Sequence, residues 1–332
     1  MRDLDENTCI SIVVPCFNEE DAICETNRQL VAAAEKTGFQ FELVYVEDGS
    51  TDATATLLTD LQRTDGRIRV VQLSRNFGHQ VAITAGLEHA SGDAVVLIDA
   101  DLQDPPDLIA ELVAHWIDGW DVVYGVRTER NGETLFKTQT AKLFYRFINA
   151  LSSTPVPLDA GDFRLMDRKV VNAVLSMPER DRFLRGMIAW VGFRQIPVYY
   201  QRSARFAGTT KYPFKKMLHF AMDGVFSFSV VPLKLATYLG LISSFLALLG
   251  GLLAIMNRIW TNHWVIGWTS LFLAILFLGG VQLTCVGIIG EYVGRTYGEA
   301  KHRPLYFVQE RLGFPDTSSR EVHRQATRNS RP

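Results

Sequence analysis

The stretch AVVLIDADLQDPPD, residues 94–107, decides the fold, because an apolar run leads directly into two aspartates. The run from Ala94 to Ile98 lacks polar alternation, which is typical of a strand buried on both faces of a parallel sheet. Asp99 and Asp101 follow, and side chains two residues apart on an extended chain point to the same side. The two prolines that come next end the strand. The sequence therefore predicts two neighbouring carboxylates at the end of a buried strand.

The first part of the chain alternates strand-like and helix-like patterns. Segments 21–36 and 52–63 carry apolar residues at three- and four-residue spacing, as amphipathic helices do, and Asp52 is a candidate cap of the second. Such an alternation predicts an α/β fold with a mostly parallel sheet flanked by helices, whose ligands bind outside the carboxyl ends of the strands. The predicted strands lie at 9–17, 41–50, 68–75, 94–102 and 121–127.

Polar and acidic side chains follow three of these strands and are expected to converge on one cleft. They are Asn18-Glu19, Glu47-Asp48 and Asp99-x-Asp101. Two carboxylates at the last spacing suit a hard cation such as Mg²⁺ or Mn²⁺, and the Gln103 amide oxygen is a candidate third ligand. The cation would neutralise charge on a leaving diphosphate, which fits group transfer from a nucleotide-activated donor. The alternative is a solvated surface pair, and the position after a buried strand argues against it.

Other nucleotide-dependent chemistries lack their motifs. No G-x-G-x-x-G follows the first strand, and no G-x-x-x-x-G-K-[ST] occurs, which argues against a dehydrogenase and a P-loop ATPase. The seven histidines are scattered and the four cysteines show no paired spacing, so neither a zinc site nor a disulfide framework is expected. No signal peptide is evident, the net charge is −2, and we expect no nucleic-acid partner.

Two uncharged runs near the C-terminus are long enough to cross about 30 Å of hydrocarbon. They span 235–257 and 264–290, and the short connector between them contains Arg258. Two spans with so short a loop form a hairpin, although two buried helices of a soluble core are the alternative. Basic residues flank its open end, which by the positive-inside rule predicts an inner-membrane protein with its catalytic part and both termini in the cytoplasm. These residues are Lys211, Lys215, Lys216, Lys234, Arg295, Lys301 and Arg303.

The sequence thus predicts five regions. Residues 1–210 form the catalytic domain, and 211–234 form a juxtamembrane amphipathic segment or a plain linker. The two transmembrane helices follow, and 291–332 form a cytoplasmic tail that is partly disordered, from Gly313 onward.

Four motifs in order resemble the family 2 glycosyltransferases with the GT-A fold. They are SIVVPCFNEED (11–21), VEDGSTDAT (46–54), SRNFGHQVAITAGLEHASGD (74–93) and DADLQDPP (99–106). With GDFRLMDRKVV (161–171) and the hairpin, the chain most resembles the polyprenyl-phosphate glycosyltransferases of the bacterial GtrB type, relatives of the dolichol-phosphate mannose synthases. The resemblance extends to about Phe314. The Q-x-x-R-W motif of processive synthases is absent, which argues against polymer synthesis.

The resemblance implies roles for the donor side of the site. Pro15, Asn18 and Glu19 would line the nucleotide pocket, although Glu19 would also suit a helix N-terminus. Asp48 would hydrogen-bond the nucleobase or ribose, and Ser74, Arg75 and Asn76 would either order the donor loop or form a structural turn. Asp99, Asp101 and Gln103 would hold the metal, with Asp99 also contacting the nucleotide-sugar.

The resemblance also assigns the reacting side. Asp101 and Asp162 are the expected catalytic residues, and Asp162 lies where the family's proposed base lies. Because an ionised phosphate is already nucleophilic, we expect Asp162 chiefly to orient the acceptor phosphate or sugar hydroxyls; the alternative is that it only pairs with Arg164. The acceptor phosphate is expected to be held by four cationic side chains and the hydroxyl of a threonine. They are Arg127, Lys137, Arg202, Lys211 and Thr140.

The implied activity is inverting transfer of one sugar from a nucleotide-sugar to polyprenyl phosphate at the cytoplasmic membrane face. UDP-glucose and undecaprenyl phosphate are the preferred substrates, and GDP-mannose is the alternative donor. A non-catalytic membrane protein with a degenerate GT-A domain is the alternative of another class. We also expect a homo-oligomer, such as the tetramers that some members form.

Overall fold

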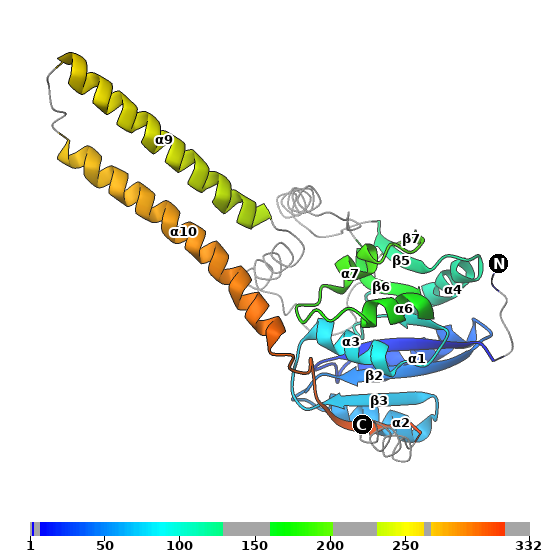
Figure 1. The fold of residues 1–332 in the computed structure, drawn as a ribbon. Coiled ribbons are helices and arrows are strands. Elements are labelled where there is room, and N and C mark those ends of the chain that lie inside the picture. The colour runs from blue at the N-terminus through cyan, green and yellow to red at the C-terminus, as the bar shows by residue number, and fades with distance from the viewer. Residues whose placement is uncertain (1, 3–6, 129–159, 202–230, 262–266, 316–332) are drawn as a thin grey trace, which may run out of the picture.

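The computed structural model describes residues 2, 7–128, 160–201, 231–261 and 267–315 (Figure 1). Its centre is an eight-stranded sheet of order β7-β5-β6-β4-β1-β2-β3-β8. Pairs β1-β2, β1-β4, β2-β3 and β5-β7 are parallel, whereas β6 runs antiparallel to β4 and β5, and β8 antiparallel to β3. The predicted α/β fold is confirmed, and its sheet contains both parallel and antiparallel strand pairs. The strands are β1 Cys9–Cys16, β2 Gln40–Glu47, β3 Ile68–Leu73, β4 Ala94–Leu97, β5 Val122–Arg127, β6 Ala160–Asp167, β7 Gln195–Tyr200 and β8 Val308–Leu312.

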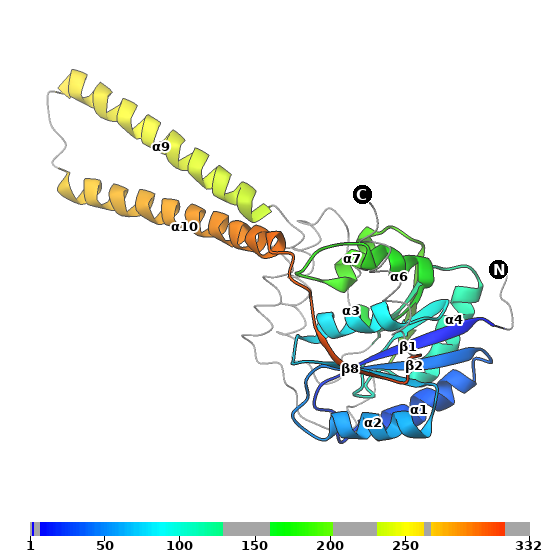
Figure 2. The ribbon, with the colours of Figure 1, turned by 60° about the horizontal axis from the view of Figure 1, so that its bottom comes forward.

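Helices cover both faces of the sheet (Figure 2). Alternate side chains of β1 enter two different cores: Ile12 packs with α1, α2 and α4, whereas Val13 packs with α3, α6 and α7. Helix α3 lies so close to the sheet that a Cβ on Gly86 would be 2.2 Å from Val13 Cγ1. These helices are α1 Ile23–Glu35, α2 Thr54–Thr64, α3 His79–His89, α4 Ile109–Ile117 (after a short 3₁₀ turn, Pro106–Leu108), α6 Arg168–Leu175 and α7 Leu184–Trp190.

Two local features differ from the sequence prediction. The strand predicted over 94–102 ends at Leu97; the Ile98 N–H still donates to the Val13 carbonyl, and the chain then leaves the sheet. The aspartates that follow therefore lie in a loop. Helix α2 begins at Thr54, and the cap position is occupied by Ala53 instead of the predicted Asp52. The Asp52 carboxylate nevertheless accepts a hydrogen bond from the Thr54 N–H (3.0 Å).

Strand β6 was not among the predicted strands, and it determines the geometry of the site. It inserts antiparallel between β4 and β5, with Leu97 opposite Arg164. Asp162 stands two residues before Arg164 on β6, next to the point where the chain leaves β4 toward Asp99, and His79 Nε2 contacts both carboxylates. Residues 63 positions apart are thereby placed together at the carboxyl end of β4.

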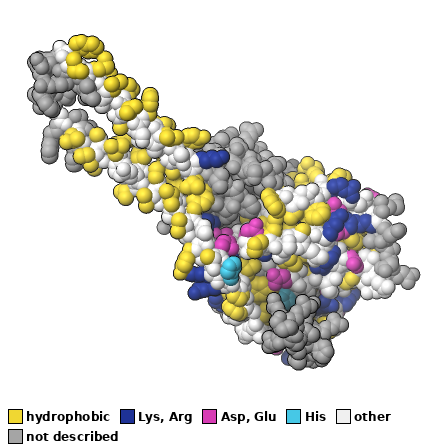
Figure 3. Space-filling model, in the orientation of Figure 1, with side chains coloured by type: hydrophobic (Ala, Val, Ile, Leu, Met, Phe, Trp, Pro, Cys, Tyr) yellow, Lys and Arg dark blue, Asp and Glu magenta, His cyan; other side chains and the backbone are white. Residues whose placement is uncertain are grey.

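Two long helices, α9 (Val231–Thr261) and α10 (Trp268–Ala300), form an antiparallel hairpin that extends away from the sheet (Figure 1). Apolar windows at Ala236–Leu253 and Ala274–Ala300 have mean hydropathies of 1.8 and 1.7, with 11% and 0% of their residues buried. Hydrophobic side chains cover this hairpin (Figure 3). Such exposure argues against two core helices of a soluble protein. Helix α9 extends beyond the predicted span 235–257 at both ends, and α10 extends beyond the end of the span 264–290 as far as Ala300.

After the hairpin the chain returns to the catalytic sheet (Figure 2). Strand β8 pairs antiparallel with the edge strand β3, and just before it the Phe307 carbonyl accepts from the Ser74 N–H (3.0 Å). The sequence prediction of a tail from residue 291 misses both the end of α10 and this strand. The catalytic sheet is therefore completed by residues that follow the membrane hairpin.

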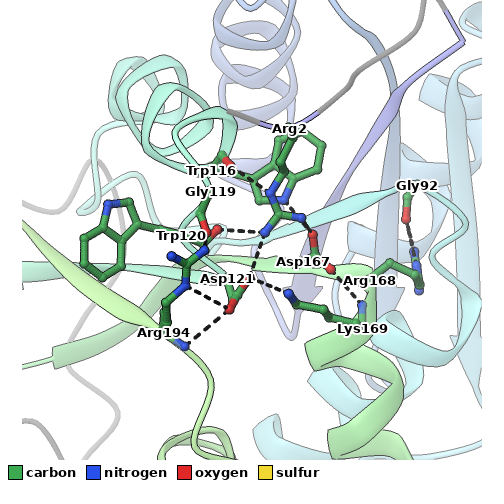
Figure 4. A network of polar contacts seen from close by, with 10 residues as sticks. All are labelled: Arg2, Gly92, Trp116, Gly119, Trp120, Asp121, Asp167, Arg168, Lys169 and Arg194. Carbon is green, nitrogen blue, oxygen red and sulfur yellow. Dashed lines mark hydrogen bonds and ion pairs between the residues drawn. The ribbon is translucent and has the colours of Figure 1, made fainter.

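The opposite edge of the sheet contains a polar network around Asp121 and Asp167 (Figure 4). Asp121 pairs with Arg2 (2.8 Å), Lys169 (2.7 Å) and Arg194 (3.8 Å). Asp167 accepts from the Trp116 indole (2.9 Å) and also contacts Arg2. Burial alone would raise the pKa of Asp121, but these cations hold it below its usual value. The network ties Arg2 to the ends of β5, β6 and β7.

Candidate active site

The loops that follow β1 and β2 are joined by hydrogen bonds at the carboxyl edge of the sheet. Asn18, whose φ of 54° is left-handed, accepts from the Thr51 N–H through Oδ1 (2.8 Å). Its own N–H donates to Ser50 Oγ (3.0 Å), and the Glu19 N–H donates to Thr54 Oγ1 (2.9 Å). The structure thus joins two predicted nucleotide-pocket residues, Asn18 and Glu19, to the segment 50–54 that follows Asp48.

Pro15 lies in a central strand, where a missing N–H would ordinarily break a ladder. The Val13 carbonyl accepts from Ile98 on the β4 side, and backbone groups two residues apart point the same way. The nitrogen of Pro15 therefore faces β4 beyond its end at Leu97. No β4 pairing is lost there.

Asp48, which is buried, fixes the loop in front of α3. Its two carboxylate oxygens accept from the N–H groups of Phe77 (2.7 Å) and Gly78 (2.9 Å). Burial raises the pKa of Asp48, and these two hydrogen bonds only partly offset that effect. Gly49 (φ 67°) touches the same loop, since a Cβ there would lie 2.4 Å from the backbone of Arg75. The loop at 74–78 is therefore ordered by β2, while nucleoside contact by Asp48 stays a prediction.

The acidic loop after β4 is held in a fixed conformation. Leu102 has a left-handed φ of 55°, and Asp101 Oδ1 accepts from the Gln103 N–H (3.1 Å). The Ala100 carbonyl accepts from Thr26 Oγ1 (2.7 Å), which ties the loop to α1. Burial, with the nearby carboxylates, raises the pKa of Asp99 to about 6, although His79 opposes the shift.

These residues fit a divalent cation. Asp99 Oδ1 is buried and accepts no hydrogen bond from the residues described, although His79 Nε2 lies 3.5 Å from it. The donor set of two carboxylates and the Gln103 amide is hard oxygen, as Mg²⁺ and Mn²⁺ prefer. The two aspartates are not joined by a third such ligand, since the described ranges contain no group of three or more His, Cys, Asp or Glu that could hold a metal. The other coordination positions would therefore belong to diphosphate oxygens and water.

Asp162 is the centre of a buried charge cluster. Both of its oxygens accept from the Arg185 guanidinium, at 2.8 and 2.9 Å. His79 Nε2 lies 3.4 Å from Asp162 Oδ2 and 3.5 Å from Asp99 Oδ1, so it bridges the two carboxylates. Burial would raise the pKa of Asp162, yet Arg185 and His79 hold it well below its usual range. Burial would lower the pKa of His79, but Asp162 and Asp99 raise it to about 9.

The alternative that Asp162 only pairs with Arg164 is wrong. The Arg164 guanidinium donates instead to the backbone carbonyls of Gly161 (2.7 Å) and Asp162 (3.3 Å). Sequence reasoning missed both actual partners. His79 stands in the quoted motif SRNFGHQ, whose position before a helix was a usable signal. Arg185 lies in no motif, and only the antiparallel placement of β6 brings Asp162 to it.

The predicted acceptor residues are placed only in part. Arg127 contacts Tyr200 Oη (3.3 Å) and the buried Asp104 (3.4 Å), which raises its pKa although burial opposes the shift. Tyr200 also donates to Asp104. Arg127 thus lies in a polar cluster next to the acidic loop. The other four predicted acceptor residues, Lys137, Thr140, Arg202 and Lys211, lie outside the described residues.

An α/β catalytic domain with an acidic loop at its carboxyl edge, continued by an apolar hairpin, defines a membrane-attached enzyme of the GT-A class. Residues 11–175 match the glycosyl transferase family 2, and residues 231–296 match the GtrB C-terminal hairpin. The chain belongs to glycosyl transferase family 2 and is a glycosyltransferase with a C-terminal membrane hairpin.

Two relatives show the extent of the similarity. The chain is 48% identical to the uncharacterized glycosyltransferase YkcC of Bacillus subtilis, over 92% of this chain and 94% of the relative. It is 41% identical to the prophage bactoprenol glucosyl transferase homolog of Escherichia coli, over 90% and 98%. A solved structure, glucosyl-3-phosphoglycerate synthase of Mycobacterium tuberculosis, aligns at 21% identity with a TM-score of 0.43, over 66% and 78% of the two chains.

Proposed function

We propose that this glycosyltransferase moves glucose from UDP-glucose onto a polyprenyl phosphate, preferably undecaprenyl phosphate, with inversion at the anomeric carbon. The observation that carries the proposal is the charge cluster in which His79 Nε2 lies 3.5 Å from Asp99 Oδ1 and 3.4 Å from Asp162 Oδ2, in a domain continued by an apolar hairpin. Relatives named bactoprenol glucosyl transferases support the lipid acceptor and the sugar. GDP-mannose is the alternative donor.

The donor would bind at the loops after β1, β2 and β4. Asp99, Asp101 and Gln103 would hold Mg²⁺ or Mn²⁺, which when bound neutralises negative charge on the diphosphate leaving group. Asn18, Glu19 and Asp48 would line the nucleoside side. Since the sequence has no glycine-rich phosphate-binding motif, the cation held by these oxygen ligands would supply most of the neutralisation of the donor diphosphate.

Asp162 would orient the acceptor and would act as a base only secondarily. Both of its oxygens already accept from Arg185, and its pKa is held well below the usual range. A carboxylate so stabilised in its ionised form is a weak base. An ionised phosphate oxygen needs little deprotonation, so orientation is the larger task.

The membrane arrangement in this proposal follows the distribution of charge. Basic residues flank the open end of the hairpin, which favours a cytoplasmic catalytic domain. The site would then face the leaflet in which the polyprenyl phosphate head group is anchored. A homo-oligomer stays a prediction.

The test is a transfer assay on the full chain purified in detergent. Radiolabelled UDP-glucose, UDP-galactose, UDP-N-acetylglucosamine and GDP-mannose are each offered with undecaprenyl phosphate and Mg²⁺ or Mn²⁺, and the lipid is extracted. We expect label in the organic phase with UDP-glucose, and β-configuration of the product by NMR. If only GDP-mannose gives a labelled lipid, GDP-mannose is the donor in place of UDP-glucose. If no donor gives a labelled lipid, the proposal is refuted.

A further inference from the structure

The end of α10 nearest the catalytic domain contacts the loop that precedes α7 (Figures 1 and 2). Arg295 Nη1 lies 3.0 Å from Asp181 Oδ2. The Glu299 carboxylate accepts from the backbone N–H of Arg180 (2.8 Å), and the Arg180 guanidinium donates to the Arg303 carbonyl. The membrane hairpin is therefore attached to this loop on both sides of the end of α10.

The loop itself, residues 177–183, is held by internal hydrogen bonds. Its buried Arg182 donates to the carbonyls of Met177 (2.6 Å) and Glu179 (3.1 Å). A guanidinium that binds two carbonyls of the same loop reduces the freedom of the backbone between them. A displacement at Arg180 or Asp181 would thus move the loop as a unit.

The next residues of the chain belong to the active site. The Leu184 N–H donates to Gln80 Oε1 (3.0 Å), next to His79 on α3. Arg185 follows and holds both oxygens of Asp162. Only three residues separate Asp181, which α10 holds, from Arg185.

We propose that Glu299 and Arg295 of the membrane helix are positioning residues for Asp162 and act through the 177–183 loop and Arg185. The inference rests on the proposed function, in which Asp162 orients the acceptor. Two parallel hydrogen bonds from Arg185 fix the carboxylate in angle as well as distance, and catalysis is sensitive to displacements of about 1 Å. The hairpin would then set the geometry of the site in addition to anchoring the enzyme.

The first experiment measures hydrogen exchange of the full chain in detergent, which does not depend on sugar transfer. Glu299→Ala removes the acceptor of the Arg180 N–H, whereas Glu299→Gln keeps a carbonyl acceptor there. Val293→Ala, at an exposed position on the same helix, is the control. We expect faster deuterium uptake in residues 180–190 for Glu299→Ala alone. Equal uptake in all three variants would overturn the proposal.

The second experiment is a double-mutant cycle on turnover. Glu299→Ala should lower kcat about two- to thirtyfold with little change in the KM for the donor, and Glu299→Gln should restore it. In an Arg185→Ala background the same substitution should have no further effect, because the link to Asp162 is already broken. Independent, multiplying effects would overturn the proposal.

Both measurements are also made on Arg295→Ala, which removes the contact with Asp181. The test therefore does not depend on the folding of a single variant. If the wild-type chain makes no glycolipid while the exchange of residues 180–190 responds as expected, the proposed function fails and the physical link stands. If glycolipid forms but neither substitution alters exchange or turnover, the positioning role fails alone.

Discussion

Arg185 holds Asp162 through two parallel hydrogen bonds of 2.8 and 2.9 Å, although no motif of the sequence connects the two residues. His79 contacts the same carboxylate and also Asp99. The acidic loop that would hold the metal and the carboxylate that would orient the acceptor therefore form one charge cluster.

Substitutions in this pair should separate orientation from proton abstraction. We expect Asp162→Asn to keep a large share of activity if orientation dominates, because the amide oxygen still accepts from Arg185. Arg185→Ala should lower turnover more, since it removes both hydrogen bonds that hold this buried carboxylate, and should destabilise the domain by about 3 kcal/mol. Initial rates and thermal unfolding of each variant test this. Wild-type rates in Asp162→Asn would remove the residue from the chemistry, and inactivity with normal stability would favour a base.

Loss of the acidic pair should abolish metal-dependent donor binding. Asp99→Asn and Asp101→Asn each remove one negative charge from the oxygen ligand set that suits Mn²⁺. We expect UDP to bind wild type more tightly with Mn²⁺ present, measured by calorimetry, and the variants to lose this gain. Asp107→Asn is the matched control, because Asp107 lies in the 3₁₀ turn that follows this loop and pairs at the surface with Lys36. Unchanged Mn²⁺-dependent binding in both variants would contradict the metal assignment.

Truncation should show that the catalytic sheet needs residues beyond the hairpin. A chain that ends at Ala300 lacks β8 and the hydrogen bond of Tyr306 to Glu88, and it exposes the edge of β3. A chain that ends at Pro315 keeps both. We expect lower thermal stability and aggregation in size-exclusion chromatography for the shorter chain only. Equal behaviour of the two chains would show that β8 is dispensable.

The network around Asp121 should make stability depend on acid pH. The folded pKa of Asp121 is lowered, so its contribution is complete above the unfolded value of about 3.9 and is lost as the pH falls through the folded pKa. We expect the stability of the wild-type chain to fall on acidification below about pH 4. Asp121→Asn should be less stable at pH 7 and should show a flatter decline. Parallel pH profiles of the two chains, measured by denaturant unfolding, would contradict this role.

The sequence by itself determined the local elements and their chemistry. Continuous apolar runs predicted the parallel strands, uncharged stretches predicted the hairpin, and the aspartates after β4 marked the candidate metal site, because each signal lies within a few neighbouring residues. The tertiary structure alone decided which distant residues meet. The antiparallel insertion of β6 brings Asp162 close to Asp99, with His79 in contact with both, and the return of the chain after α10 adds β8 to β3. Strand pairing depends on contacts across the whole chain, and no local periodicity encodes it.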